Sequence, residues 1–153
     1  PGLPDWQALN ACSALFSEDN SNTGVYHTGP WKLGDANLIR ALGLNYRIQR
    51  HQTDSDLWSL LHDYTDKRKP ILLLNWTPNW TDYRLPGEFV KFPSYTPECE
   101  SNPEFGINKL ITGDCGNVQV SNSVVHAGWN AVRQHEGQGQ CHPRTNFQRP
   151  GTT

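Results

Sequence analysis

The chain has 153 residues, enough for one domain with a hydrophobic core, and hydrophobic residues make up 35% of it. Its net charge of −2 comes without a basic stripe, which argues against nucleic acid as a partner, and its apolar runs are too short to span a membrane. The chain begins at Pro1, contains no Met and shows no signal peptide, so we expect a fragment or a processed product of a longer protein.

Three segments have apolar residues at helical spacing: 5–16, 35–42 and 53–69. Each begins at an Asp or Thr whose side chain can accept a hydrogen bond from the first helical turn. Gly43 and Pro70 follow the second and third segments, and both residue types end helices. The sequence therefore predicts three helices.

Four segments are typical of strands: 24–28, 44–48, 71–75 and 88–92. The third has no polar alternation, which predicts burial on both faces of a sheet. Helices and strands alternate along the chain, and this order predicts the α/β class with a mainly parallel sheet. Right-handed connections would place helices on both faces of that sheet.

From about residue 117 the pattern weakens. We expect residues 1–117 to form an α/β lobe and residues 118–153 to form an atypical polar tail that is partly disordered. Within this tail, residues 118–125 alternate weakly and are a candidate strand. Residues from Gln134 onward contain too little apolar surface to offset the entropy of ordering.

The four cysteines are Cys12, Cys99, Cys115 and Cys141, and none belongs to a C-x-x-C motif, which argues against a zinc ribbon or a thioredoxin-type site. Cys99 and Cys115 bracket a loop rich in Pro, Asn and Gly. A disulfide there would stabilise the fold by roughly 3 kcal/mol and would imply an oxidising compartment. The alternative is that these cysteines are free, buried thiols.

Tryptophans lie in Pro-containing loops after two of the predicted strands. Trp31 follows the first strand, and Trp76 and Trp80 follow the buried one. Ligands of parallel sheets bind outside the carboxyl ends of the strands. A Trp face is also the best side-chain partner for a cation that has no N–H donor. These loops are therefore candidates for an amine-binding cage, and the alternative is that the rings only pack in the core or a lid.

Residues 69–80, which read KPILLLNWTPNW, resemble the W-T-P-x-W segment of glycine betaine and proline betaine-binding proteins. Residues 24–30 resemble the segment that opens the ligand loop of the second lobe in that family. Residues 89–100 and 114–117 resemble a cysteine-containing loop of its trimethylamine N-oxide branch. The resemblance covers about residues 4–117 and implies one lobe of a type II periplasmic-binding-protein fold, whose intact form clamps its ligand between two lobes.

By this resemblance, Trp76 matches the first Trp of the motif and is the main cage candidate, and Trp80 matches the second, which would support the loop. Trp31 lies a residue or two before the usual position of its counterpart. The polar candidates for a ligand carboxylate or oxide are His27, Asn75 and Thr77, and the alternative for each is hydrogen bonding within its own loop. Because only one lobe is represented, we expect half a cage, with weak ligand binding or none.

The resemblance further implies a small quaternary or methylated amine as ligand, an ABC permease as partner, contact with a membrane only through that permease, and a periplasmic or extracellular location. We expect no cofactor and no metal. The sequence has no His-x-x-x-His spacing, no Gly-x-Ser-x-Gly motif and no phosphate-binding glycine loop, so we expect a protein that is not an enzyme. Two alternatives stay open: a carbohydrate-binding module, usually a β-sandwich, and an adaptor fragment without a small-molecule ligand.

Overall fold

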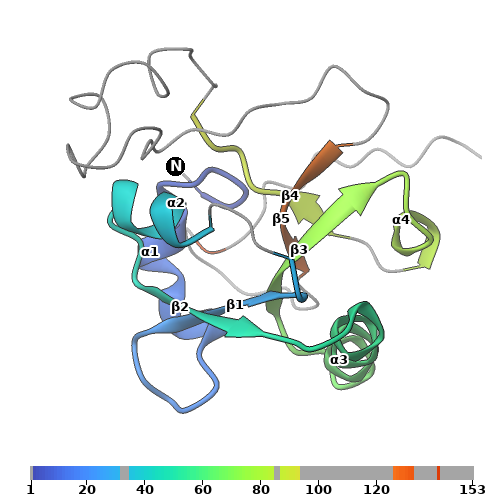
Figure 1. The fold of residues 1–153 in the computed structure, drawn as a ribbon. Helices are drawn as coiled ribbons and strands as arrows, with labels where there is room; N and C mark the ends of the chain where they lie inside the picture. The colour runs from blue at the N-terminus through green and yellow to red at the C-terminus, as the bar shows by residue number, and fades with distance from the viewer. Residues whose placement is uncertain (1, 32–34, 85–86, 94–125, 133–140, 142–153) are drawn as a thin grey trace, which may run out of the picture.

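A computed structural model describes residues 2–31, 35–84, 87–93, 126–132 and 141 of the chain. These residues form a five-stranded sheet with the strand order β2-β1-β3-β5-β4. Helices pack on both faces of the sheet, and Figure 1 shows α3 well apart from α1 and α2, with strands running between them. The predicted α/β class is therefore confirmed.

The parallel part of the sheet consists of β1 (Gly24–Thr28), β2 (Tyr46–Arg50) and β3 (Ile71–Thr77). β1 lies in the middle and pairs in parallel with both neighbours. The first five residues of β3 are buried, as expected for an apolar run without alternation. Because β1 and β3 are adjacent and parallel, the loops that follow them leave the same edge of the sheet.

Two antiparallel strands extend this sheet beyond β3. β5 (His126–Val132) pairs with β3 along its whole length, and β4 (Glu88–Phe89) pairs with β5. β5 belongs to the segment that we expected to be a polar tail, and it lies inside the sheet. The candidate strand 118–125 and most of that tail lie outside the described residues, so the boundary at residue 117 stays a prediction.

One face of the sheet is covered by α1 (Ala8–Ala11), the 3-10 helix η1 (Ser13–Phe16) and α2 (Asp35–Ala41). Their buried side chains join the sheet residues Tyr26, Tyr46, Leu72 and Leu74 in one core cluster. The other face is covered by α3 (Asp54–Asp66), whose Leu57 and Leu61 pack on Ile71 and Leu73. A further short helix, α4 (Thr81–Arg84), follows β3 and was not expected.

The first predicted helix is wrong in two respects. Asp5 does not cap it, because the cap position belongs to Gln7 and Asp5 instead forms a bridge with Lys91 beside β4. The helix is also not continuous, since a 3-10 turn begins at Ser13. The Ser13 hydroxyl donates hydrogen bonds to the backbone oxygens of Asn10 and Asn22, and such side-chain-to-backbone bonds compete with regular helix.

The other expected elements differ only at their ends. The second strand begins two residues later than expected, and the fourth is only two residues long. Gly43 follows α2 with a φ of 59°, in the left-handed region that glycine adopts at helix ends. None of the helices described is long and apolar enough to cross a membrane.

The sequence offered Thr53 or Asp54 as the cap of α3, and Thr53 is the cap, where it forms a capping box with Asp56. The Thr53 hydroxyl accepts from the Asp56 backbone N–H at 3.1 Å, and the Asp56 carboxylate accepts from the Thr53 N–H at 3.1 Å. Thr53→Ala should lower the free energy of unfolding by about 1 kcal/mol, because the helix loses this cap. Urea denaturation measures the change, and Thr53→Ser, which keeps the hydroxyl, should stay close to the native protein.

Candidate functional site

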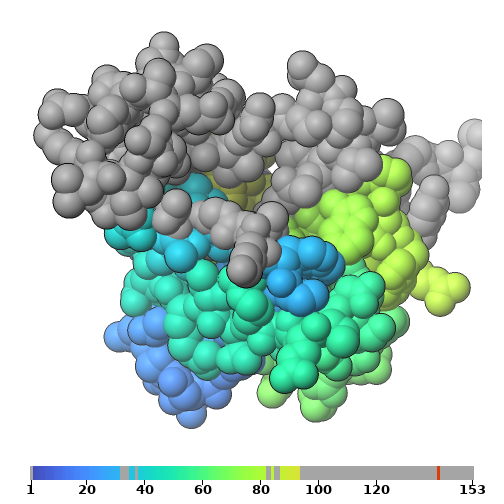
Figure 2. All heavy atoms as spheres, in the orientation of Figure 1, coloured from blue at the N-terminus to red at the C-terminus, as the bar shows by residue number. Residues whose placement is uncertain are grey.

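Four tryptophans meet at the edge of the sheet where β1 and β3 end, and we call them the aromatic cluster: Trp31, Trp58, Trp76 and Trp80. Trp31 lies in the loop after β1, Trp76 is in the last part of β3, Trp80 precedes α4, and Trp58 is on α3. Figure 2 shows the bright-blue loop around residues 29–31 lying against the green surface of α3 and the yellow-green surface of the β3–α4 region.

The rings form a continuous row. Trp76 lies between Trp31, at 5.7 Å between ring centroids, and Trp58, at 5.2 Å. Trp58 also contacts Trp80 at 6.0 Å, and His62 stacks on Trp80 at 5.1 Å with only 13° between the ring planes. The structure thus brings Trp31 and Trp76 together, with Trp76 inside β3 and not in the loop after it as the sequence indicated.

The pair Trp31–Trp76 is the candidate for contact with a cation. The two ring planes stand at 89° in an edge-to-face contact, so the edge of one ring covers part of the face of the other, and we call this right-angled arrangement the corner. Each cation–π contact contributes about 0.5–2 kcal/mol, more where water is excluded. Both rings are half-buried, which leaves part of each ring exposed.

Trp58 was not among the predicted site residues, although it contacts Trp76 more closely than Trp31 does. It lies one residue after the buried Leu57 on α3. Trp80 is 39% exposed and contacts Trp58, so it lies at the outer end of the row. Its expected role in supporting the loop stays a prediction.

The amide of Asn75 is committed to its own loop. Asn75 Nδ2 donates to the Thr81 hydroxyl at 3.1 Å, and Asn75 Oδ1 accepts from the Trp76 backbone N–H at 2.8 Å and from the Asn79 amide at 2.9 Å. The residue is 3% exposed. This is the alternative that the sequence left open for Asn75, and it makes Asn75 a residue that orients Trp76. Thr77 is half-buried and ends β3.

His27 lies in a polar network beside α3. Its Nε2 is 3.3 Å from a Glu18 carboxylate oxygen, and its Nδ1 is 3.1 Å from Nε2 of His51. Tyr64 donates to the same Glu18 oxygen at 2.7 Å, and Arg47 pairs with the other oxygen at 3.1 Å. These contacts hold the loop before β1 against β2 and α3. Ligand contact by His27 and by Thr77 stays a prediction.

Burial controls the charge of this network. It lowers the pKa of His27 from 6.5 to about 4, and the Glu18 carboxylate only partly opposes that shift. The ring is therefore neutral at pH 7. Burial also raises the pKa of Tyr64, and the hydrogen bond to Glu18 adds to the increase. Within the described residues, no group of three His, Cys, Asp or Glu side chains is arranged to hold a metal ion.

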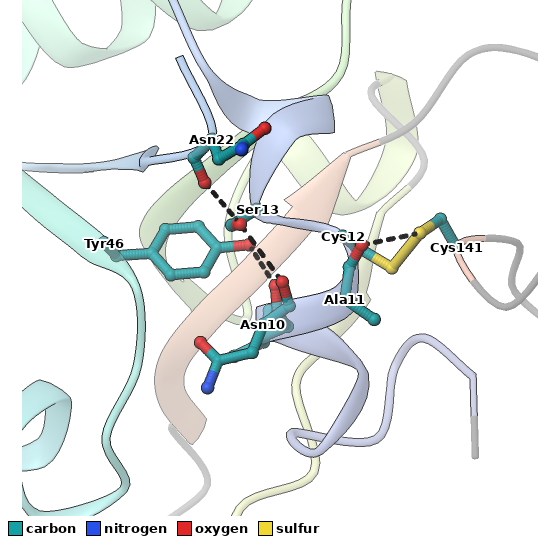
Figure 3. Close-up of a disulfide and its surroundings, with 8 residues drawn as sticks. Asn10, Ala11, Cys12, Ser13, Asn22, Tyr46 and Cys141 are labelled. Carbon is teal, nitrogen blue, oxygen red and sulfur yellow. Dashed lines mark hydrogen bonds between the residues drawn. A yellow bond between two sulfur atoms is a disulfide. The ribbon is translucent and has the colours of Figure 1, made fainter.

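A disulfide joins Cys12, at the end of α1, to Cys141, at a sequence separation of 129 residues. Figure 3 shows it beside Ala11 and near the contacts of Ser13 and Tyr46. This pairing was not expected. The predicted Cys99–Cys115 pair lies outside the described residues and stays a prediction.

No protein-family model matches the chain. The chain is similar to the trimethylamine N-oxide-binding protein of Pelagibacter ubique (strain HTCC1062), with 35% identity over 125 residues. The match covers 76% of this chain but only 37% of that protein. The matched part of this chain therefore spans little more than a third of the length of that relative. The α/β fold also differs from the β-sandwich typical of carbohydrate-binding modules.

Proposed function

We propose that this chain is the ligand-binding lobe of a solute-binding protein, and that it takes small quaternary or methylated amines such as glycine betaine or trimethylamine N-oxide. The observation that supports this most directly is the right-angled Trp31–Trp76 pair at the carboxyl ends of β1 and β3. The similarity to a trimethylamine N-oxide-binding protein supports the same ligand class.

The ligand class follows from what aromatic faces can recognise. A trimethylammonium group has no N–H to donate, so carboxylates and carbonyls cannot hold it by hydrogen bonds, whereas ring faces attract its positive charge. Two such contacts contribute about 1–4 kcal/mol together, which corresponds to a dissociation constant of about 1 mM or weaker. We therefore expect this lobe to bind weakly and a second lobe to provide the remaining affinity.

The cellular role belongs to the same proposal. A disulfide such as Cys12–Cys141 persists in oxidising compartments, which supports a periplasmic or extracellular location. A binding lobe there would deliver its amine to the permease of an ABC importer.

Tryptophan fluorescence during titration tests the ligand. Glycine betaine and trimethylamine N-oxide should each produce a saturable change with a midpoint on the order of 1 mM or higher. The compound 3,3-dimethylbutanoate, which replaces the quaternary nitrogen of glycine betaine by carbon, should produce none, because it has no cation for the rings to attract.

Variants locate the response. Trp76→Leu should abolish the saturable change, while Trp6→Leu, which alters a half-buried tryptophan beside Lys91, should keep it. A folded protein that responds equally to 3,3-dimethylbutanoate, or does not respond to either amine at tenfold the expected midpoint, would contradict the proposal.

A further inference from the structure

The loop that contains Trp31 is held by Arg50 through its main chain. Arg50 is the last residue of β2 and lies opposite Thr28, the last residue of β1, in the parallel register. Its Nη1 donates hydrogen bonds to the backbone oxygen of Gly29, at 3.2 Å, and to that of Trp31. One guanidinium nitrogen thus holds the loop on both sides of Pro30.

Gly29 leaves the space that the ring of Trp31 occupies. A Cβ atom at position 29 would lie 2.2 Å from the Trp31 ring, so the indole lies directly on the glycine backbone. Any side chain at position 29 would therefore clash with the Trp31 ring unless the ring moved. Gly29 therefore permits the ring position, and the Arg50 hydrogen bonds restrain the backbone on which the ring depends.

The same loop determines whether Trp31 meets Trp76. Trp76 is fixed independently, since its backbone N–H donates to Asn75 and its ring contacts Trp58. Trp31 has its corner geometry with Trp76, 5.7 Å and 89°, only while the loop after β1 keeps its shape. The orientation of one wall of the corner thus depends on a residue outside the aromatic cluster.

We propose that Arg50 is a positioning residue for the amine site: by holding the Gly29 and Trp31 carbonyls, it sets the orientation of Trp31 against Trp76 and so the affinity for the amine. This proposal rests on the proposed function for its effect on affinity, but its effect on ring geometry can be measured without ligand. The planar guanidinium suits this role because its N–H groups point in fixed directions toward two acceptors.

The first test is circular dichroism of the ligand-free protein. Indole rings this close together couple, and the difference between the native spectrum and that of Trp31→Leu isolates the contribution of Trp31. Arg50→Met removes the donors but keeps most of the aliphatic stem, and it should lose most of that contribution. Gly29→Ala should also lose the contribution of Trp31, because the added methyl group displaces the ring. Arg47→Met, which changes another residue of β2 that pairs with Glu18, should keep that contribution.

The second test is affinity, with choline as the probe. Arg50→Met should raise the dissociation constant about fivefold, the loss of roughly one cation–π contact, and Arg50→Lys should lie in between. The loss of charge alone should lower the dissociation constant, because removing a positive charge near the site favours binding of a cation. A weaker affinity in Arg50→Met therefore reports ring position and not charge.

The outcomes separate the two proposals. A changed dichroism spectrum in Arg50→Met, with no amine binding even by the native protein, would contradict the proposed function and leave the positioning role intact. An unchanged spectrum in folded Arg50→Met and Arg50→Lys would overturn the positioning role. Equal loss of affinity in Arg47→Met and Arg50→Met would also overturn it, since Arg47 does not touch the loop carbonyls in this structure.

Discussion

Cys141→Ser is expected to lower the free energy of unfolding by about 3–5 kcal/mol, the largest effect of any single change we predict. The Cys12–Cys141 bond closes a segment with a sequence separation of 129 residues, and the entropy that a crosslink removes from the unfolded chain increases with loop length. Serine at position 141 breaks the crosslink without altering Cys12, which is only 1% exposed in the core beside α1.

Urea denaturation of oxidised protein measures this change. The double variant Cys12→Ala with Cys141→Ser excludes re-pairing of Cys12 with another cysteine, and it should be no more stable than the single variant. Cys115→Ser is the comparison variant, because it should break only the separate pair predicted from the sequence and lower the free energy of unfolding by no more than roughly 3 kcal/mol. The pairing would be contradicted if peptide mapping without reductant linked Cys12 to Cys99 or Cys115, or if Cys141→Ser left the denaturation midpoint unchanged.

The elements that sequence predicted best are those specified by local chemistry. Thr53 caps α3 because Thr53 and Asp56 form a capping box within one turn. β3 is buried because its apolar run has no polar alternation, and β1 lies between a polar loop and Gly29 with the bounds expected. In each case the determining residues lie close together along the chain.

The features that sequence missed depend on distant partners. β5 contains Gly128 and Asn130 among its residues and becomes a strand only because β3 offers a complete edge for pairing. Cys12 and Cys141 are too far apart in sequence for their spacing to indicate a bond. The break at Ser13 depends on an acceptor, the Asn22 backbone oxygen, that lies in the next loop.

The candidate site divides in the same way. The meeting of Trp31 with Trp76 was predictable, because adjacent parallel strands end at one edge of a sheet. The contribution of Trp58 was not, because it depends on how α3 is rotated against β3. Arg50 was also missed, since nothing in its sequence context indicates that its side chain reaches two carbonyl oxygens of another loop.

The buried His27 should make the fold sensitive to mild acid. Its pKa is lowered from 6.5 to about 4 by burial, so between these values the unfolded chain binds a proton that the folded chain excludes. Stability from this residue is complete above pH 6.5 and is lost as the pH falls toward 4, by about 3 kcal/mol in total. Below pH 4 the residue causes no further loss.

The hydrogen bonds explain why the folded state resists this proton. The Glu18 carboxylate can only accept, so His27 Nε2 must donate to it, which leaves Nδ1 to accept from His51. A proton on Nδ1 would break the bond to His51. It would also add a positive charge to a network that already contains the Arg47 guanidinium, and the Glu18 carboxylate in that network already accepts a hydrogen bond from Tyr64. Protonation and folding are therefore opposed at this position.

Urea denaturation at a series of pH values from 4 to 7 tests this. His27→Gln should flatten the dependence of the unfolding free energy on pH by up to about 3 kcal/mol across that range, because glutamine does not titrate. His62→Gln, which alters the exposed histidine stacked on Trp80, is the matched control and should keep the native slope. Parallel curves for the native protein and His27→Gln would show that His27 takes up its proton equally in both states, and that the network around Glu18 does not depend on a neutral ring.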